Sequence, residues 1–181
     1  VEQLVDELER RGLAKDIFWR VSCRIDDIND STLIRMKNAG LMSVYIGIES
    51  GNDMGLDIYN KHYSVSDIYQ AFEILKAIEM PFEFGFMLLH PYSTLESIRK
   101  DVDFLKGVND YGDAIVHFTK MVPYAGTSIE KRLKDEERLT GTIDLPDYNY
   151  LDSRLDLLQL FCRDAFHFRN FGHGGLVELL R

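Results

Sequence analysis

Two charged side chains, Arg24 and Glu49, each directly follow a short apolar segment of the chain. The segments cover residues 17–23 and 43–48, and both are rich in β-branched and aromatic residues, as in β-strands. If the two strands are parallel neighbours, their carboxyl ends meet at one edge of the sheet and the guanidinium lies near the carboxylate. A buried Arg/Glu pair of this kind could support the fold or contact a ligand, and both roles stay open.

The alternation of side chains along the second segment indicates which face a site would occupy. Valine and isoleucine recur at every other position, whereas the intervening positions are small or polar and end at Glu49. Because successive side chains of a strand point to opposite faces, helices should cover the apolar face. Glu49 is therefore expected on the opposite face, beside a ligand at the carboxyl ends of the strands.

Other residues capable of chemistry are scattered. Cys23 and Cys162 lie far apart without a Cys-x-x-Cys motif, which argues against a disulfide framework and a structural zinc site. Two buried thiols are the simpler interpretation. His90, at the end of an apolar segment, could contact substrate, and His117 lies within one. Packing is the commoner role for such histidines.

The elements that must position these residues alternate along the chain. Helical periodicity in residues 1–12 is followed by four strand-like segments, each succeeded by a helical one. The expected strands are 17–23, 43–48, 82–89 and 113–121, and the expected helices after them are 30–40, 64–80, 94–108 and 128–139. This order predicts an α/β fold with four parallel strands and covering helices, a segment of a TIM-like (β/α) barrel. A terminal helix is expected beyond residue 147.

Composition limits the classes of protein that remain. The chain has 181 residues, of which 45% are hydrophobic, so it can bury a core of single-domain size. Its net charge of -9 disfavours a surface that follows a nucleic-acid backbone. Neither a membrane span nor an export signal is visible, which predicts a cytoplasmic protein.

Several short motifs, in register over roughly residues 1–130, carry a resemblance to a known family. They are Arg24-Ile25-Asp26, Gly47-Ile48-Glu49-Ser50-Gly51, Asn60-Lys61, Gly85-Phe86-Met87-Leu88-Leu89 and Pro123-Tyr124-Ala125-Gly126-Thr127. In this the chain resembles the radical S-adenosylmethionine (SAM) superfamily, in the branch that includes methylthiotransferases and cobalamin-dependent enzymes. It departs from the usual pattern at His90-Pro91-Tyr92-Ser93-Thr94, where a Gly-x-Pro-Gly-Glu-Thr turn is common. We interpret this turn as a mark of the cobalamin-dependent subgroup.

The resemblance also implies what this chain lacks. Members of the superfamily hold a [4Fe-4S] cluster with a Cys-x3-Cys-x2-Cys loop after the first barrel strand, and the cluster binds SAM. The sequence contains no such loop. Residues 1–145 would then be the third to sixth strands of a partial barrel, and residues 146–181 a helical extension. The resemblance implies a fragment of an iron–sulfur oxidoreductase type of enzyme, inert alone, because it cannot cleave SAM reductively.

The resemblance assigns a set of residues to the part of the SAM-binding site that this chain would retain. Polar groups at the ends of the first two strands would meet the ribose and methionine parts of SAM, the third strand would pack against adenine, and backbone after the fourth would supply polar contacts. These residues are Arg24, Glu49 and Ser50, then Gly85 and Met87, then Val122 and Tyr124. The parent enzyme would use SAM and [4Fe-4S], with cobalamin as a further candidate on another domain, and this fragment would hold no metal.

A partial barrel also has consequences for the partners of this chain, and one alternative to the enzyme-fragment function stays open. Absence of the first two barrel strands would leave a sheet edge uncovered, together with the rings of Phe84, Phe86 and Phe118. We therefore expect the N-terminal part of the same protein as a partner, or self-association into a homodimer through that edge. The alternative function is a non-catalytic binding or scaffold module derived from such a barrel. A phosphate-handling barrel enzyme lacks support because no glycine-rich phosphate loop precedes a helix.

Overall fold

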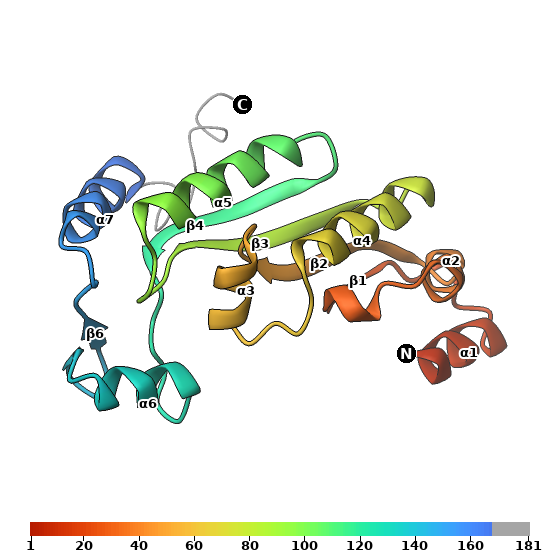
Figure 1. The fold of residues 1–181 in the computed structure, drawn as a ribbon. Coiled ribbons are helices and arrows are strands. Elements are labelled where there is room, and N and C mark those ends of the chain that lie inside the picture. Colours follow the sequence, from red (N-terminus) through yellow and green to blue (C-terminus); the bar gives the residue numbers. More distant parts are fainter. Residues whose placement is uncertain (168–181) are drawn as a thin grey trace. The chain divides into compact units, whose positions relative to one another are not determined.

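The computed structural model describes residues 1–167 (Figure 1). These residues form two compact units that share strands. The first unit comprises Val1–Phe86 and Val102–Ile115, and the second comprises Met87–Asp101 and the described residues from Val116 onward. The predicted division into residues 1–145 and 146–181 rests on the family resemblance and not on compactness, and it stays a prediction. Residues 168–181 of that extension lie outside the described residues.

Four strands form one sheet in the order β1-β2-β3-β4, and the predicted α/β class with parallel strands is confirmed. The strands are β1 (Trp19–Cys23), β2 (Leu41–Glu49), β3 (Phe82–Leu89) and β4 (Asp113–Lys120). In the first unit β1 pairs in parallel with β2, with Cys23 opposite Ile46, and β2 pairs in parallel with β3, with Gly47 opposite Gly85. The carboxyl ends of these three strands therefore meet at one edge.

Helices of the first unit follow the strands as the periodicity predicts. They are α1 (Glu2–Arg10), the short 3-10 helix η1 (Ile25–Asp27), α2 (Asp30–Asn38), α3 (Asp53–Ile58) and α4 (Val65–Ala77). Side-chain oxygens of Asn29, Asn52 and Ser64 accept backbone N–H groups at the starts of α2, α3 and α4. At the start of α4, Asp67 completes a capping box with Ser64. The short helix α3 was not predicted.

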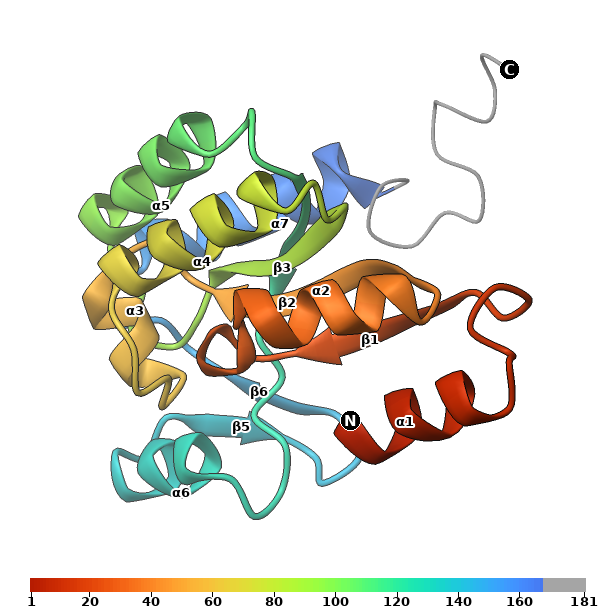
Figure 2. The ribbon, with the colours of Figure 1, turned by 90° about the vertical axis from the view of Figure 1, so that its right-hand side faces the viewer.

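The core of the first unit lies between the sheet and its helices. Val44 and Ile46 on β2 are fully buried on the face that α2 and α4 cover (Figure 2). Phe72 of α4 packs on Phe84 of β3 with ring centroids 5.1 Å apart. Phe84 and Phe86 are themselves 0% exposed, so the expectation that a partial barrel would bare these rings is wrong. They lie on the helix-covered face, one position out of phase with Gly85.

The second unit is built around the ends of β3 and β4. Its elements are the first part of α5 (Leu95–Gly107), α6 (Ser128–Asp135), the antiparallel pair β5 (Leu139–Gly141) and β6 (Pro146–Tyr148), and α7 (Arg154–Ala165). The rings of Phe118 and Phe166 stack with their centroids 4.2 Å apart. The third ring that we expected to be bare therefore has an aromatic neighbour. The terminal helix is present, but a hairpin precedes it that the sequence did not predict.

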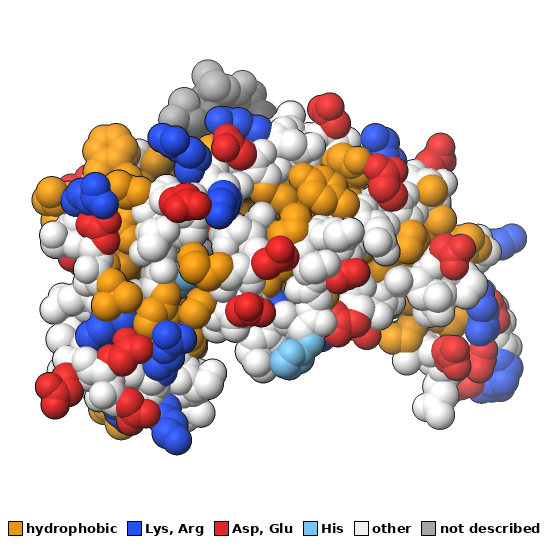
Figure 3. Space-filling model, viewed as in Figure 1, with side chains coloured by type: hydrophobic (Ala, Val, Ile, Leu, Met, Phe, Trp, Pro, Cys, Tyr) orange, Lys and Arg blue, Asp and Glu red, His pale blue; other side chains and the backbone are white. Residues whose placement is uncertain are grey.

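Two surface properties bear on the expected partners. Within residues 1–167, no helix is both long enough and apolar enough to cross a membrane. Acidic and basic side chains are interspersed over the face shown in Figure 3, and no extended basic patch is visible there. Exclusion of nucleic acid as a partner stays a prediction.

Candidate functional site

Glu49 lies at the carboxyl end of β2, on the face opposite the buried valine and isoleucine side chains. A side chain added at Gly47 would come within 2.7 Å of the Glu49 carboxylate, so both positions face the same way. A bulge between Gly47 and Glu49 shifts the pairing with β3, and Glu49 has a φ of 69°. Positive φ is strained for a residue with a side chain, and such strain is common at functional sites.

Lys61 and Tyr63, in the loop between α3 and α4, hold this strand end. The Lys61 ammonium donates to the Gly47 carbonyl at 2.7 Å and lies 3.5 Å from the Glu49 carboxylate. The Tyr63 hydroxyl donates to the same carbonyl at 3.2 Å. Burial and, after it, the negative charge of Glu49 raise the pKa of Tyr63, so the phenol stays protonated and remains a donor. Both side chains fix the geometry of the bulge.

The expected Arg24–Glu49 pair is not formed. The Arg24 guanidinium binds Asp26 instead, at 3.0 Å, and is 48% exposed, whereas the cation of Glu49 is Lys61. The two strands are neighbours as predicted, but η1 turns the chain directly after Arg24 and brings Asp26 within reach. Arg24 still lies near the site, because its guanidinium carbon is 5.9 Å from the centre of the Tyr63 ring.

Ser50 is fully buried beside the first turn of α3. Its hydroxyl accepts the backbone N–H of Asn52 at 3.2 Å, and a side chain at Gly55 would come within 2.1 Å of it. Ser50 therefore supports the junction between β2 and α3. Its predicted contact with a cofactor stays a prediction.

Gly85 on β3 faces the same side as Tyr45 on β2. A side chain at Gly85 would come within 2.1 Å of the Tyr45 hydroxyl, so the glycine makes room for the tyrosine. Burial, and then the charges of Glu49 and Glu83, raise the pKa of Tyr45. The space next to Gly85 is therefore filled by the phenol of Tyr45, a residue that the sequence did not single out.

The remaining predicted residues belong to the second unit. Met87 is half-buried on β3, and Val122 and Tyr124 follow β4 with 42% and 70% of their surface exposed. The Tyr124 N–H donates to the Val122 carbonyl at 3.0 Å, and the Tyr124 carbonyl accepts the Thr127 hydroxyl at 2.7 Å. The N–H and carbonyl groups of Tyr124 are therefore already hydrogen-bonded within the turn that they form. Contacts from it to a cofactor stay a prediction.

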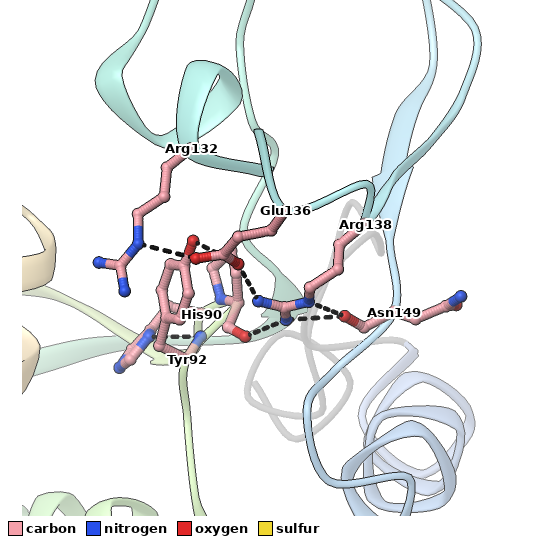
Figure 4. A network of polar contacts seen from close by, with 7 residues as sticks. His90, Tyr92, Arg132, Glu136, Arg138 and Asn149 are labelled. Atoms are coloured by element: carbon pink, nitrogen blue, oxygen red, sulfur yellow. Dashed lines mark hydrogen bonds and ion pairs between the residues drawn. The ribbon is translucent and has the colours of Figure 1, made fainter. Parts of the chain in front are cut away.

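The turn after β3 is held by a network of cations around Tyr92 (Figure 4). The Tyr92 hydroxyl donates to Glu136 at 3.1 Å, and the Arg132 guanidinium lies 3.8 Å above the tyrosine ring. Arg138, only 12% exposed, donates to the Pro91 carbonyl at 2.6 Å and binds Glu136 at 2.8 Å. The residues that replace the usual family turn are therefore anchored to the end of α6.

His90 is buried within that turn. Its Nδ1 accepts the Tyr92 N–H at 3.2 Å, and burial lowers the pKa of the imidazole to about 4. The ring is therefore neutral at physiological pH and carries its proton on Nε2. This arrangement favours a packing role over contact with substrate.

No group of three or more His, Cys, Asp or Glu side chains is arranged to hold a metal ion in residues 1–167. Burial and, after it, the charge of Asp27 raise the pKa of Cys23 to about 11, and burial also raises the pKa of Cys162. Metal ligation requires the thiolate form. The chain has two cysteines, fewer than the three thiolates that a Cys-x3-Cys-x2-Cys loop supplies.

Lys61, Tyr63 and Tyr45 are the residues at this site that sequence reasoning missed. Lys61 belongs to the quoted Asn60-Lys61 motif, but nothing in the sequence indicates that its side chain reaches back to β2. Tyr45 shares the predicted polar face with Glu49, and this alternation was the signal that could have identified it.

Parallel strands that end in polar side chains, with helices over the opposite face, define an α/β unit of the partial (β/α) barrel class. The family model of the radical SAM superfamily matches residues 1–105. The chain belongs to the radical SAM superfamily, as its motifs predicted.

Several known proteins are similar to this chain. The anaerobic magnesium-protoporphyrin IX monomethyl ester cyclase of Cereibacter sphaeroides is 22% identical over 151 residues, which are 82% of this chain and 24% of that protein. The chain thus spans about a quarter of that relative. The cobalamin-dependent SAM radical enzyme OxsB, with aqua-cobalamin and SAM bound, has a TM-score of 0.68 at 15% identity, over 83% of this chain and 29% of its own. TsrM of Kitasatospora setae, with cobalamin and a [4Fe-4S] cluster bound, has a TM-score of 0.53 at 15% identity, over 63% and 24%.

Proposed function

We propose that this chain supplies one side of the SAM-binding site in a radical SAM enzyme. The observation that carries the proposal is the Glu49 carboxylate, held on the open face at the end of β2 by a positive φ and by Lys61. SAM carries hydroxyls, an ammonium group and a carboxylate, so its site needs acceptors, donors and a cation. Within the first unit Glu49 offers an acceptor, and the Lys61 ammonium, which has three N–H groups, offers both a donor and a cation.

The roles of the individual residues follow from their chemistry. Glu49 would accept hydrogen bonds from ribose hydroxyls or from the ammonium group of SAM. Lys61 and the half-exposed guanidinium of Arg24 would attract its carboxylate. Tyr45 and Gly85 would line the side that faces adenine. The contacts that the resemblance implies for Met87, Val122 and Tyr124, in the second unit, stay predictions. Ser50 would act by holding the turn that follows Glu49.

A [4Fe-4S] cluster supplies the electron that cleaves SAM in this superfamily, and three thiolates hold it. Cys23 and Cys162 do not fit that requirement, so we assign the cluster to no residue of this chain. Residues 1–181 alone are therefore expected to bind SAM and leave it intact. The radical methylation, rearrangement or sulfur insertion of the whole protein would need a cluster-bearing part, and cobalamin is assigned to no residue of this chain.

We also propose that another strand pairs with β1, which lies at the edge of the sheet. The strand would come from a cluster-bearing part of the protein or from a second copy, and either would satisfy the outer backbone groups of β1. Hydrogen exchange of the β1 amides tests this. Protection that rises with protein concentration would indicate a second copy, whereas fast exchange at every concentration would exclude self-pairing through this edge.

The SAM site is tested by calorimetric titration of the chain with SAM, compared with the Glu49→Gln variant. This change keeps the size of the side chain but removes the charge that faces Lys61, and we expect SAM affinity to fall by about tenfold or more, the weight of one charged hydrogen bond. Glu83→Gln is the matched control. Glu83 also faces the open side, and its carboxylate binds Arg20 at 2.7 Å, so SAM affinity should stay within about threefold of the parent chain.

Failure would be plain in either measurement. Equal SAM affinity of Glu49→Gln and the parent chain would remove Glu49 from the site. Loss of intact SAM, followed by chromatography after addition of a strong reductant, would contradict the absence of a cluster from this chain.

A further inference from the structure

The helix α7 is apolar on two opposite sides. Its inner side buries Leu155 and Cys162, which are 0% and 5% exposed. On its outer side Leu157, Leu160 and Phe161 are 69%, 43% and 65% exposed. These three residues, which we call the outer stripe, follow the i, i+3, i+4 spacing of a helix-pairing surface. A contiguous exposed apolar stripe of this kind indicates an interaction surface.

We propose that the outer stripe pairs with the same stripe of a second copy of this chain, with the two helices antiparallel. Such a contact is closed and two-fold symmetric, so each copy offers and receives the same residues. In the heptad pattern of helix pairs, Leu157 and Leu160 take two neighbouring core positions, and each lies opposite the other residue in the second copy. The next core position of α7 is Asp164, so the apolar contact is confined to Leu157, Leu160 and Phe161. Phe161 then lies against the aliphatic part of Arg154 of the second copy.

Charges beside the outer stripe select the second copy and the antiparallel direction. Asp156 and Arg163 lie seven residues apart on one flank of α7, next to the core positions. When Leu157 meets Leu160 of the second copy, Asp156 falls beside Arg163 of that copy, and symmetry repeats the pair on the other side. Parallel helices in the same heptad register would leave both charges without an opposite charge. The helix is thus complementary to itself in one orientation.

Contacts within the chain do not compete strongly with this pairing. Arg163 binds the neighbouring Asp164 at 2.8 Å, but the two side chains are 51% and 71% exposed, and exposed pairs of this kind contribute little. The helix has 12 residues, a length of about 18 Å, so the contact is small and the dimer should be weak. This inference does not depend on the binding of SAM.

The oligomeric state is tested by sedimentation equilibrium of the chain from about 10 to 500 µM, a range suited to a small interface. We expect a reversible monomer–dimer equilibrium, and Leu157→Ser should raise its dissociation constant by about tenfold or more. Leu145→Ser is the matched control, because Leu145 is 79% exposed but lies in the hairpin loop outside α7. It should leave the dissociation constant unchanged. Far-UV circular dichroism verifies that both variants fold.

A charge exchange tests the register. Asp156→Arg alone and Arg163→Asp alone should each weaken self-association, because each places like charges across the contact. An equimolar mixture of these two variants should recover association, since every charge then meets its opposite. A parent chain that stays monomeric throughout the range, or a dimer that Leu157→Ser leaves unchanged, would overturn the proposal. A mixture no stronger than its components would overturn the antiparallel register.

Discussion

Glu49 shows how a single residue connects backbone geometry with charge. Its positive φ and the bulge beside it cost conformational energy, which the surrounding contacts must offset. The Gly47 carbonyl, displaced from regular pairing by the bulge, receives hydrogen bonds from both Lys61 and Tyr63. The same ammonium balances the Glu49 carboxylate. The loop after α3 therefore stabilises the one strand end where a ligand-binding carboxylate is expected.

Replacement of Lys61 by methionine should destabilise the fold. The methionine keeps most of the apolar stem but leaves Glu49 without its cation and the Gly47 carbonyl with one donor fewer. Because the Lys61 and Glu49 side chains are only 16% and 25% exposed, we expect a loss of about 1–2 kcal/mol in unfolding free energy by urea titration. Lys100→Met, in an exposed pair with Glu96, should cost less than about 0.5 kcal/mol. Equal losses would show that Lys61 is no more than a surface charge.

His90 should make stability depend on pH. Burial lowers its pKa from 6.5 to about 4, so between these values the unfolded chain binds a proton that the folded chain excludes. Its contribution to stability is complete above pH 6.5 and is lost as pH falls toward 4, by about 3 kcal/mol. The urea midpoint should fall over this window in the parent chain and less steeply in His90→Asn. Parallel pH profiles of the two proteins would contradict this account of His90.

At the scale of elements, helix ends offer a stability test that is independent of the site. Glu79 follows Ile78, the C-cap residue of α4, and has a φ of 52°, a conformation that glycine adopts without strain. Glu79→Gly should therefore raise the unfolding free energy by about 0.5–1 kcal/mol in urea titration. Glu79→Ala keeps the strained conformation and should bring no gain. A stability gain of equal size in both variants would show that the charge of Glu79, and not its backbone, is responsible.

The elements were predicted well where one face of each is buried. Alternation in β2 identified the helix-covered face, because Val44, Ile46 and Ile48 have no other place to be buried. Short elements escaped prediction, since α3 and the β5–β6 hairpin depend on caps and turns and not on a long apolar pattern. Phe84 was expected to be bare but is buried, because it lies on the helix-covered face of β3 against Phe72.

The predicted site was limited by a different cause. The end of β2 was placed correctly from its sequence, but the partner of Glu49 depends on a loop that returns from α3. Arg24 was the nearest cation along neighbouring strands, yet Asp26, two residues later, binds it. A cation within two residues of a carboxylate tends to form the local pair, whereas the pair between Lys61 and Glu49 requires tertiary structure. Sequence alone could therefore identify the carboxylate but not its cation.

At the scale of the whole molecule, both β3 and β4 run from one compact unit into the other. Unfolding of either unit would disrupt strands that the other needs, so we expect a single cooperative transition. Trp19, the one tryptophan of the sequence, reports on the first unit through its emission. Cys162, buried on α7, reports on the second through its reaction with a thiol reagent in a Cys23→Ala variant. The urea midpoints from the two probes should coincide. Reaction of Cys162 at urea concentrations that leave Trp19 emission native would instead show that the second unit unfolds on its own, and that the shared strands do not couple the two.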